Sequence, residues 1–437
     1  MAQALDLLTA NDRRGEYPPS LYAAETALPT AMPALEGSAR ADVAIIGAGF
    51  TGLSAALHLA ERGYDVAVLD AQRAGWGASG RNGGQVGSGQ RVDQEQLEAR
   101  HGLQTAKRLW EIGEESKNLV RELIARHGIE CQPAQGIIHA DHRAKDVAHS
   151  HAYADRLHEV YGYEHVRKLD RDELRSMVSS PAYHGGSIDT DAFSLQPLAY
   201  ALGLARAAEK AGVRIYEQSR VREVVRGAGV TLKTRKGEIA ADHVIVACNG
   251  YLGDLVPEVA ARVMPINNFI IATEKLGERQ AAEVMNTEAA VADSKFVINY
   301  FRMSHDRRMV FGGGENYGYR FPADIKRFVQ KPMLEIFPQL KDTRVEYGWG
   351  GTLAITMKRM PFFSRTGANI FTCSGYSGQG VGMATLAGKL TAEAIAGQSE
   401  KFDVMASLPT PGFPGGSRLR QPLLVLAMSW YALRDRL

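Results

Sequence analysis

The chain has 437 residues, of which 45% are hydrophobic and 23% charged, the proportions of a globular protein large enough for two domains. Its 51 basic and 49 acidic residues are scattered along the chain, which argues against a nucleic-acid-binding protein. Three widely spaced cysteines, Cys131, Cys248 and Cys373, lack metal-ligand spacing. We therefore expect buried free thiols in a reducing cytoplasm, and no metal site.

Residues 1–39 contain four prolines and little periodicity, which predicts an extended N-terminal arm. They lack the basic-then-apolar pattern of a signal peptide. No apolar stretch reaches the ~20 residues of a membrane-spanning helix. We expect no transmembrane segment.

A dinucleotide-binding pattern follows the arm. Residues 41–46 form an apolar strand, 53–62 a helix that ends at Gly63, and 66–69 a second strand that ends at Asp70. The turn between the first strand and the helix comprises Gly47, Ala48, Gly49, Phe50, Thr51 and Gly52. Such glycines allow a tight turn, close approach to a pyrophosphate and close helix–strand packing, while the acid accepts ribose hydroxyls.

Two further loops have the composition of cofactor loops. Residues 75–85 hold several glycines together with Ser79, Asn82 and Gln85, so this segment can wrap an extended ligand with its backbone N–H groups. Residues 374–382 join a strand to a helix, whose N-terminus offers partial positive charge and free amides. Placed at the pyrimidine end of a flavin, it would stabilise the negative charge that develops on reduction.

The remaining pattern alternates between helical and β-rich stretches. Helices are expected at 94–127 with a break near Gly102, and at 143–160, 198–210, 325–336 and 381–396. Strands are expected at 137–140, 213–216, 243–247, 264–273, 296–303, 308–311, 344–352 and 369–373, with a hairpin or meander over 219–240.

The predicted fold class is α/β. A Rossmann-like cofactor domain is assembled from discontinuous segments, 40–130, 180–260 and 355–400, and a mainly β substrate domain is interleaved as 131–179 and 261–354. Residues 401–437 form a tail. Its apolar run at 422–433, flanked by arginines, predicts a docked C-terminal helix, with a helix that binds a membrane surface or a partner as the alternative.

These three loops and the strand with its turn at 244–250 resemble the D-amino-acid oxidase family of FAD enzymes. Further segments resemble the bacterial gamma-glutamylputrescine oxidases of that family: 20–24, 77–85, 251–254, 337–341, 359–361, 375–378 and 413–416. The resemblance implies oxidation of an amine to an imine, its hydrolysis to an aldehyde, and the reduction of O₂ to hydrogen peroxide. A gamma-glutamylated polyamine is the implied substrate.

The resemblance also implies which residues hold FAD. They are the turn residues Gly47, Ala48, Gly49, Phe50, Thr51 and Gly52, the acid Asp70 with Ala71, the loop residues Gly77, Ala78, Ser79, Asn82, Gly83, Gly84 and Gln85, and Val221, Gly250, Gly375, Tyr376, Ser377, Gly378, Gln379, Gly380 and Val381. Some relatives attach FAD through a cysteine near 349–352, where this chain has none, so non-covalent FAD is expected.

Substrate residues are harder to assign. Tyr300 and Arg302 alternate on one predicted strand and share a face, where the guanidinium would pair with a substrate carboxylate. Further candidates are Trp349, Arg359, Tyr376 and Gln379. Relatives carry a histidine at position 379, whereas glutamine does not titrate near neutral pH, and no catalytic base is assigned.

Two other functions fit the same residues. The first keeps the fold but changes the substrate or acceptor, as in a sarcosine- or D-amino-acid-type oxidase or a quinone-linked dehydrogenase. The second is a dinucleotide-binding module without turnover.

Overall fold

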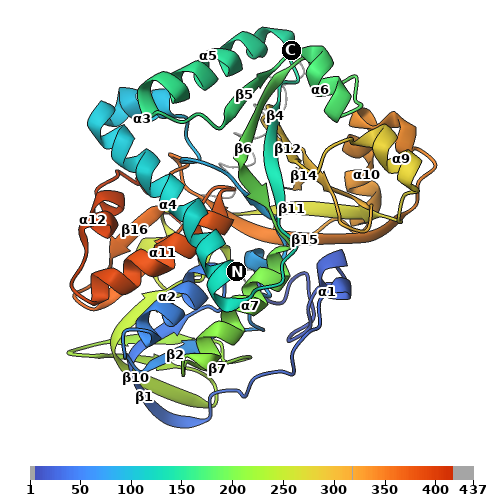
Figure 1. Cartoon of the computed structure of the whole chain (residues 1–437). Coiled ribbons are helices and arrows are strands. Elements are labelled where there is room, and N and C mark those ends of the chain that lie inside the picture. The colour runs from blue at the N-terminus through green and yellow to red at the C-terminus, as the bar shows by residue number, and fades with distance from the viewer. Residues whose placement is uncertain (1–4, 317, 417–437) are drawn as a thin grey trace.

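The computed structural model describes residues 5–316 and 318–416. The predicted C-terminal helix at 422–433 lies outside these residues. Figure 1 shows an α/β body around β1 and β10, with a β-rich region beside it that extends to α5 and α6. None of the described helices is long and apolar enough to cross a membrane.

The described residues of the α/β body form an eight-stranded sheet with the order β16-β17-β10-β1-β2-β7, to which β9 adds through β10 and β8 through β9. The strands are β1 (Gly37–Ile46), β2 (Val66–Leu69), β7 (Arg214–Tyr216), β8 (Glu223–Arg226), β9 (Val230–Lys233), β10 (Gly237–Val246), β16 (Phe362–Arg365) and β17 (Ile370–Ser374). The β17-β10-β1-β2-β7 pairs are parallel. Their apolar β-branched residues are buried on both faces, as parallel strands require.

The second sheet contains nine described strands in the order β15-β11-β14-β13-β12-β4-β6-β3, with β5 paired to β6. The strands are β3 (Gln85–Val86), β4 (Ala134–Ala140), β5 (Val166–Leu169), β6 (Gly186–Ser194), β11 (Met264–Thr273), β12 (Ala290–Asp293), β13 (Tyr300–Met303), β14 (Met309–Asn316) and β15 (Val345–Ile355).

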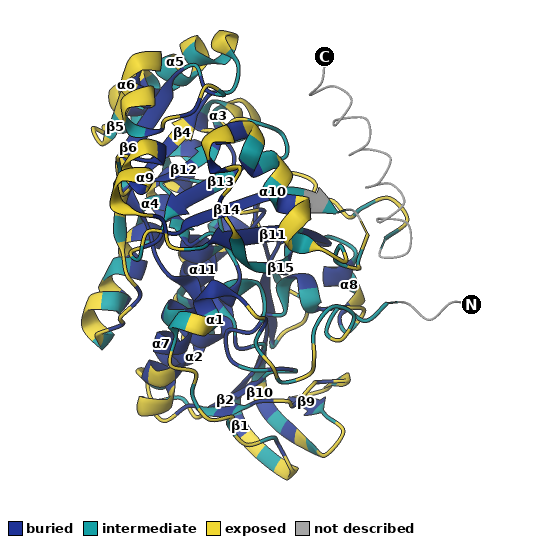
Figure 2. Ribbon diagram, turned by 90° about the vertical axis from the view of Figure 1, so that its right-hand side faces the viewer, coloured by how far each residue is buried: buried dark blue, intermediate teal, exposed yellow. Residues whose placement is uncertain are grey.

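Helices cover both sheets. They are α1 (Leu21–Glu25), α2 (Phe50–Ala60), α3 (Gln94–His101), α4 (Leu103–His127), α5 (Ala144–Tyr161), α6 (Arg171–Met177), α7 (Pro197–Lys210), α8 (Pro257–Ala260), α9 (Glu278–Val284), α10 (Ile325–Ile336), α11 (Gly380–Ile395) and α12 (Glu400–Ala406). One apolar core joins α2, α4, α7 and α11 to the first sheet, and another joins α9 and α10 to the second. Figure 2 shows that these interiors are buried, whereas the outer faces of α5 and α6 are exposed.

Most of the predicted elements are confirmed. The break at Gly102 is present, with φ +78° at that residue. The arm contains an unpredicted helix, α1, capped by Ser20 and buried at Leu21 and Tyr22. Strand β13 begins four residues later than expected. The unpredicted strand β6 lies in the second sheet, so a division that follows the sheets would assign 186–194 to the β domain.

Candidate active site

A continuous cavity of about 1320 Å³ is lined by residues of both sheets. The three predicted loops all reach it. The predicted cofactor residues among its lining are Gly47, Gly49, Phe50, Thr51, Asp70, Ala71, Gly77, Ala78, Ser79, Asn82, Gly83, Gly84, Gln85, Val221, Tyr376, Ser377, Gly378, Gln379, Gly380 and Val381. The cavity exceeds the ~300–1,000 Å³ of a typical small-molecule pocket, so it has room for a dinucleotide and a second molecule.

The turn after β1 brings the N-terminus of α2 to the cavity. Gly47 has φ +108°, and its N–H donates to the carbonyl of Leu69 at 2.8 Å. A Cβ at Gly52 would lie 1.9 Å from the carbonyl oxygen of Gly47, so only glycine lets the helix pack this close to the strand. The N-terminus of α2 thereby faces the cavity, as a pyrophosphate site requires.

Asp70 lies at the end of β2, beside this turn. Its carboxylate accepts hydrogen bonds from the backbone N–H groups of Ala48 and Gln72, each at 2.7 Å. Burial raises the pKa of Asp70 to about 6, and these two hydrogen bonds limit the rise. The carboxylate is thus held at the cavity wall, where hydroxyl donors of a ligand would favour its charged form.

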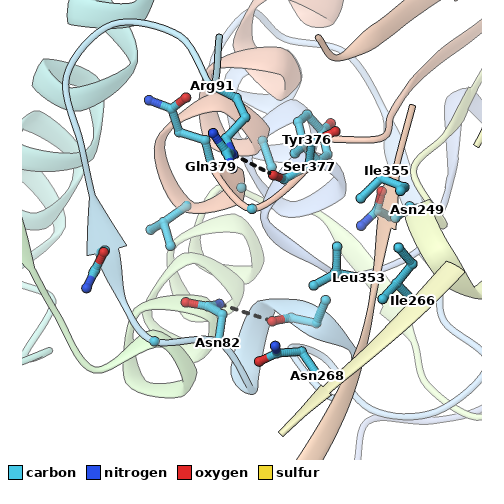
Figure 3. Close-up of a pocket in the computed structure, with 18 of the residues that line it drawn as sticks. Asn82, Arg91, Asn249, Ile266, Asn268, Leu353, Ile355, Tyr376, Ser377 and Gln379 are labelled. Atoms are coloured by element: carbon cyan, nitrogen blue, oxygen red, sulfur yellow. Dashed lines mark hydrogen bonds between the residues drawn. The ribbon is translucent and has the colours of Figure 1, made fainter. Parts of the chain in front are cut away.

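The glycine-rich loop is rigidly held by its own polar side chains. The Asn82 amide donates to the carbonyls of Ala78 and Ser79 at 3.0 Å and accepts the N–H of Gly84 at 2.8 Å. The Ser79 hydroxyl accepts the N–H of Phe50 at 3.0 Å, which ties the loop to the start of α2. The close-up in Figure 3 shows Asn82 on the cavity wall below the third loop.

The third loop, 374–382, closes the opposite side. Gly375 has φ +76°, and its N–H donates to the Asn249 side chain at 2.9 Å. The Gln379 amide nitrogen donates to the carbonyls of Ser88 and Gly89 at 3.2 and 3.0 Å, while its buried oxygen has no hydrogen-bond partner within the described part of the chain. Figure 3 shows Gln379 beside Arg91, whose guanidinium donates to the carbonyl of Ser377 at 3.2 Å.

Four predicted cofactor residues lie behind the cavity wall. They are Ala48, Gly52, Gly250 and Gly375, none of which is among the lining residues. Gly250 packs against the carbonyl of Leu353, where a Cβ would lie 2.8 Å from the oxygen. We infer that these residues shape the site rather than contact a ligand.

The structure brings some substrate candidates to the cavity and leaves others away from it. Tyr300, Arg359, Tyr376 and Gln379 line it. The Tyr300 hydroxyl donates to the side chain of Asn268, and the ring lies against Gly83 of the glycine-rich loop. The Tyr376 hydroxyl forms a 2.6 Å hydrogen bond with Thr51.

Arg302 and Trp349 are not among the lining residues. Arg302 is 5% exposed and interacts with Tyr22 of α1, so the arm covers this part of the strand face. Trp349 packs edge-on against Tyr22, with ring centroids 5.0 Å apart. Its indole N–H donates to the carbonyl of Arg81 at 3.0 Å.

Arg81 is a residue that the sequence reasoning missed. Its guanidinium donates to the carbonyls of Trp76 and Gly350 at 2.7 and 3.0 Å and pairs with Asp12 at 2.9 Å. It is buried and stacks over the Trp76 ring at 4.3 Å. Arg81 therefore joins the N-terminal arm, the glycine-rich loop and the second sheet behind the cavity. No local pattern signals such a contact.

Three converging loops, a helix N-terminus at the cavity and an acid at the end of β2 fit an adenine dinucleotide, so the fold and the site define a dinucleotide-dependent oxidoreductase. Comparison with known proteins makes this assignment specific. The family described as FAD dependent oxidoreductase matches residues 42–394. The chain therefore belongs to this family of FAD enzymes.

Individual relatives agree. The chain is 42% identical to a probable oxidoreductase, OrdL, of Rhizobium meliloti over 93% of this chain and 94% of the relative. It is 40% identical to the gamma-glutamylputrescine oxidoreductase of Escherichia coli over 97% of this chain and 99% of the relative. Among solved structures, glycine oxidase from Geobacillus kaustophilus superposes with a TM-score of 0.69 at 21% identity, covering 82% of this chain and 95% of that one. This last similarity supports the fold alone.

Proposed function

We propose that the protein oxidises the terminal primary amine of a gamma-glutamylated polyamine. The amine becomes an imine, water converts the imine to an aldehyde with release of ammonia, and O₂ takes up two electrons and two protons to give hydrogen peroxide. The observation that carries this proposal is the 40% identity with the gamma-glutamylputrescine oxidoreductase of Escherichia coli, which extends over nearly the whole of both chains.

FAD, when bound, supplies the acceptor for the two electrons and the hydrogen removed from the substrate carbon. In the proposed arrangement the N-terminus of α2 holds the pyrophosphate and Asp70 accepts the adenosine ribose hydroxyls. Residues 77–85 hold the middle of the cofactor. The N-terminus of α11, with Gln379, faces the ring end and stabilises negative charge there.

An apolar wall beside the third loop is suited to a neutral amine. Ile266 of β11 and Leu353 and Ile355 of β15 line the cavity there, and Figure 3 shows them on the side opposite Gln379. A desolvating environment lowers the pKa of an ammonium group, which favours the neutral amine that donates hydride. We assign to this wall the role of excluding water from the reacting amine.

We propose that FAD is bound without a covalent link. Cys131 and Cys373 are buried and Cys248 partly so, and burial raises the pKa of all three thiols to about 12. Thiolate is the nucleophile of a cysteine, so these residues are poorly suited to flavin attachment. Cys248 lines the cavity beside Asp70, at the end we assign to the adenosine.

A peroxide-coupled assay with purified protein tests the proposed function. Gamma-glutamylputrescine and free putrescine are compared with sarcosine and a set of D-amino acids. We expect peroxide with the gamma-glutamylated amine. Activity confined to sarcosine or D-amino acids would overturn the substrate assignment, and flavin reduction without peroxide would instead indicate a dehydrogenase.

A further inference from the structure

The cavity continues past the three loops into a channel floored by the second sheet. Its floor is formed by Ile137, His139 and Asp141, at alternate positions along and just after β4. Alternate residues of a strand share one face. The paired strands contribute neighbours in register, since His139 lies opposite Ser187 of β6 and Ala292 of β12.

Helix α5 forms the roof of this channel. The cavity-lining residues of the helix are Asp146, His149, Ser150, Tyr153 and Leu157. Residues three or four apart lie on the same face of a helix, so Asp146, His149 or Ser150, Tyr153 and Leu157 form one stripe. The channel is therefore defined by the floor residues Ile137, His139 and Asp141 and by this stripe.

The channel begins beside the third loop. A Cβ at Gly87 would lie 4.0 Å from both the Gln379 amide nitrogen and the Cδ1 of Ile137, so these two side chains flank the same point. From Ile137 the backbone runs four residues outward to Asp141, which is about 13 Å at the rise of a β-strand.

Asp141 is an unusual residue at the outer end. It is 4% exposed, its backbone N–H donates to the carbonyl of Gly185 at 2.8 Å, and its side chain interacts with Ser150 of α5. The second carboxylate oxygen, Oδ2, has no hydrogen-bond partner among the residues that the structure describes. Leaving such an atom unpaired costs free energy, and a cationic donor is its best partner.

Two other buried acids of the cavity accept several hydrogen bonds from protein groups. Asp189 accepts the Tyr163 hydroxyl at 2.7 Å and two backbone N–H groups at 3.1 Å. Asp293 accepts the side-chain and backbone nitrogens of Asn299 at 2.8 and 2.9 Å. Asp141 is thus a buried carboxylate of this region whose second oxygen is left for a ligand. Lys295 lines the same cavity, next to Ser294, whose N–H donates to the carbonyl of Ala140 at 3.0 Å.

We propose that the channel holds the distal end of the substrate and that Asp141 binds the α-ammonium group of its gamma-glutamyl moiety, with Lys295 near the α-carboxylate. This inference rests on the proposed function. In gamma-glutamylputrescine, nine bonds separate the carbon that is oxidised from the α-ammonium nitrogen, about 11 Å when extended at the reach of a peptide chain. That length matches the path from Ile137 to Asp141.

Binding of two unreactive analogues to the FAD-loaded protein tests the inference. Gamma-glutamyl-n-butylamide lacks the amine that is oxidised but keeps the α-ammonium group, and glutaryl-n-butylamide lacks the ammonium group as well. Calorimetry should show that the wild type binds the first about 10- to 100-fold more tightly, as expected for a charge-assisted hydrogen bond. Asp141→Asn should remove this difference, whereas Glu159→Gln, an equal charge change at an exposed position of α5, should preserve it.

Kinetics separate this inference from the proposed function. With gamma-glutamylputrescine, Asp141→Asn should raise KM by about 10- to 100-fold, the factor expected for the two analogues, and leave kcat nearly unchanged. A contact remote from the reacting carbon stabilises the bound substrate and the transition state equally, so its loss affects KM alone. A wild type that reacts with gamma-glutamylputrescine but binds the two analogues equally would overturn the inference alone, whether or not the variant folds. A wild type whose flavin is not reduced by gamma-glutamylputrescine would overturn the proposed function, and the inference with it.

Discussion

The carboxylate of Asp70 accepts a 2.7 Å hydrogen bond from the backbone N–H of Ala48, which ties the end of β2 to the glycine turn after β1. The contact joins two features that the sequence separates by a helix. It fixes the acid at the cavity wall beside the helix N-terminus, so that one short region presents both an acceptor for hydroxyls and donors for phosphate.

Replacing Asp70 with Asn should weaken FAD binding by about tenfold or more, because charge-assisted hydrogen bonds to the ribose would be lost. The affinity should also depend on pH. The pKa of Asp70 is raised to about 6, and hydroxyl donors lower it, so FAD binding releases a proton and weakens as the pH falls below 6. Titration of apoprotein with FAD between pH 5 and 8 checks both effects. An affinity that is flat across this range in the wild type would contradict the role of Asp70.

Gly52→Ala should destabilise the cofactor domain by about 1–3 kcal/mol or more, since its Cβ would lie 1.9 Å from the carbonyl oxygen of Gly47. Urea unfolding and FAD retention on gel filtration measure the effect. The matched control is Gly367→Ala, because a Cβ at Gly367 meets no atom within 4 Å. Equal stability of the two variants would show that α2 does not need this close approach.

His58 should make the folded state sensitive to acid. It is 5% exposed on α2, its Nδ1 lies 2.7 Å from the carbonyl oxygen of Ser54, and burial lowers its pKa to about 4. The unfolded chain binds the proton first, near pH 6.5, so the free energy of unfolding should fall by about 2–3 kcal/mol between pH 6.5 and pH 4. Urea unfolding of wild type and His58→Gln over this range isolates the contribution, which should be missing from the variant.

Non-covalent FAD predicts a simple result. After acid precipitation the flavin should remain in the supernatant and the protein pellet should be colourless. A yellow pellet would show a covalent link and would contradict the proposal of non-covalent FAD.

The predictable features of this site are local in sequence. Asp70 directly follows the apolar strand β2, and the glycine turn joins the neighbouring strand β1 to α2. The spacing of these residues alone therefore indicates the site for the adenosine and pyrophosphate of a dinucleotide. Asp141 also directly follows a strand, and the same reasoning applied to residues 137–140 would have selected it as a residue at a sheet edge.

The missed features depend on contacts between distant segments. Alternation correctly predicts that Tyr300 and Arg302 share a face, yet Tyr22 of the N-terminal arm packs over Arg302 while Tyr300 meets the cavity. Strand β6 was not predicted because Ser187 and Asp189 interrupt the apolar pattern, and these polar residues are buried because they face the cavity. Polar residues that face a cavity can thus hide a strand from a hydrophobicity pattern.

Anaerobic mixing of the purified protein with gamma-glutamylputrescine tests the central claim most directly. The visible absorbance of the oxidised flavin should bleach in a single substrate-dependent phase, and admission of O₂ should restore it with formation of peroxide. Persistence of the oxidised spectrum with this amine, together with bleaching by sarcosine or a D-amino acid, would contradict the account.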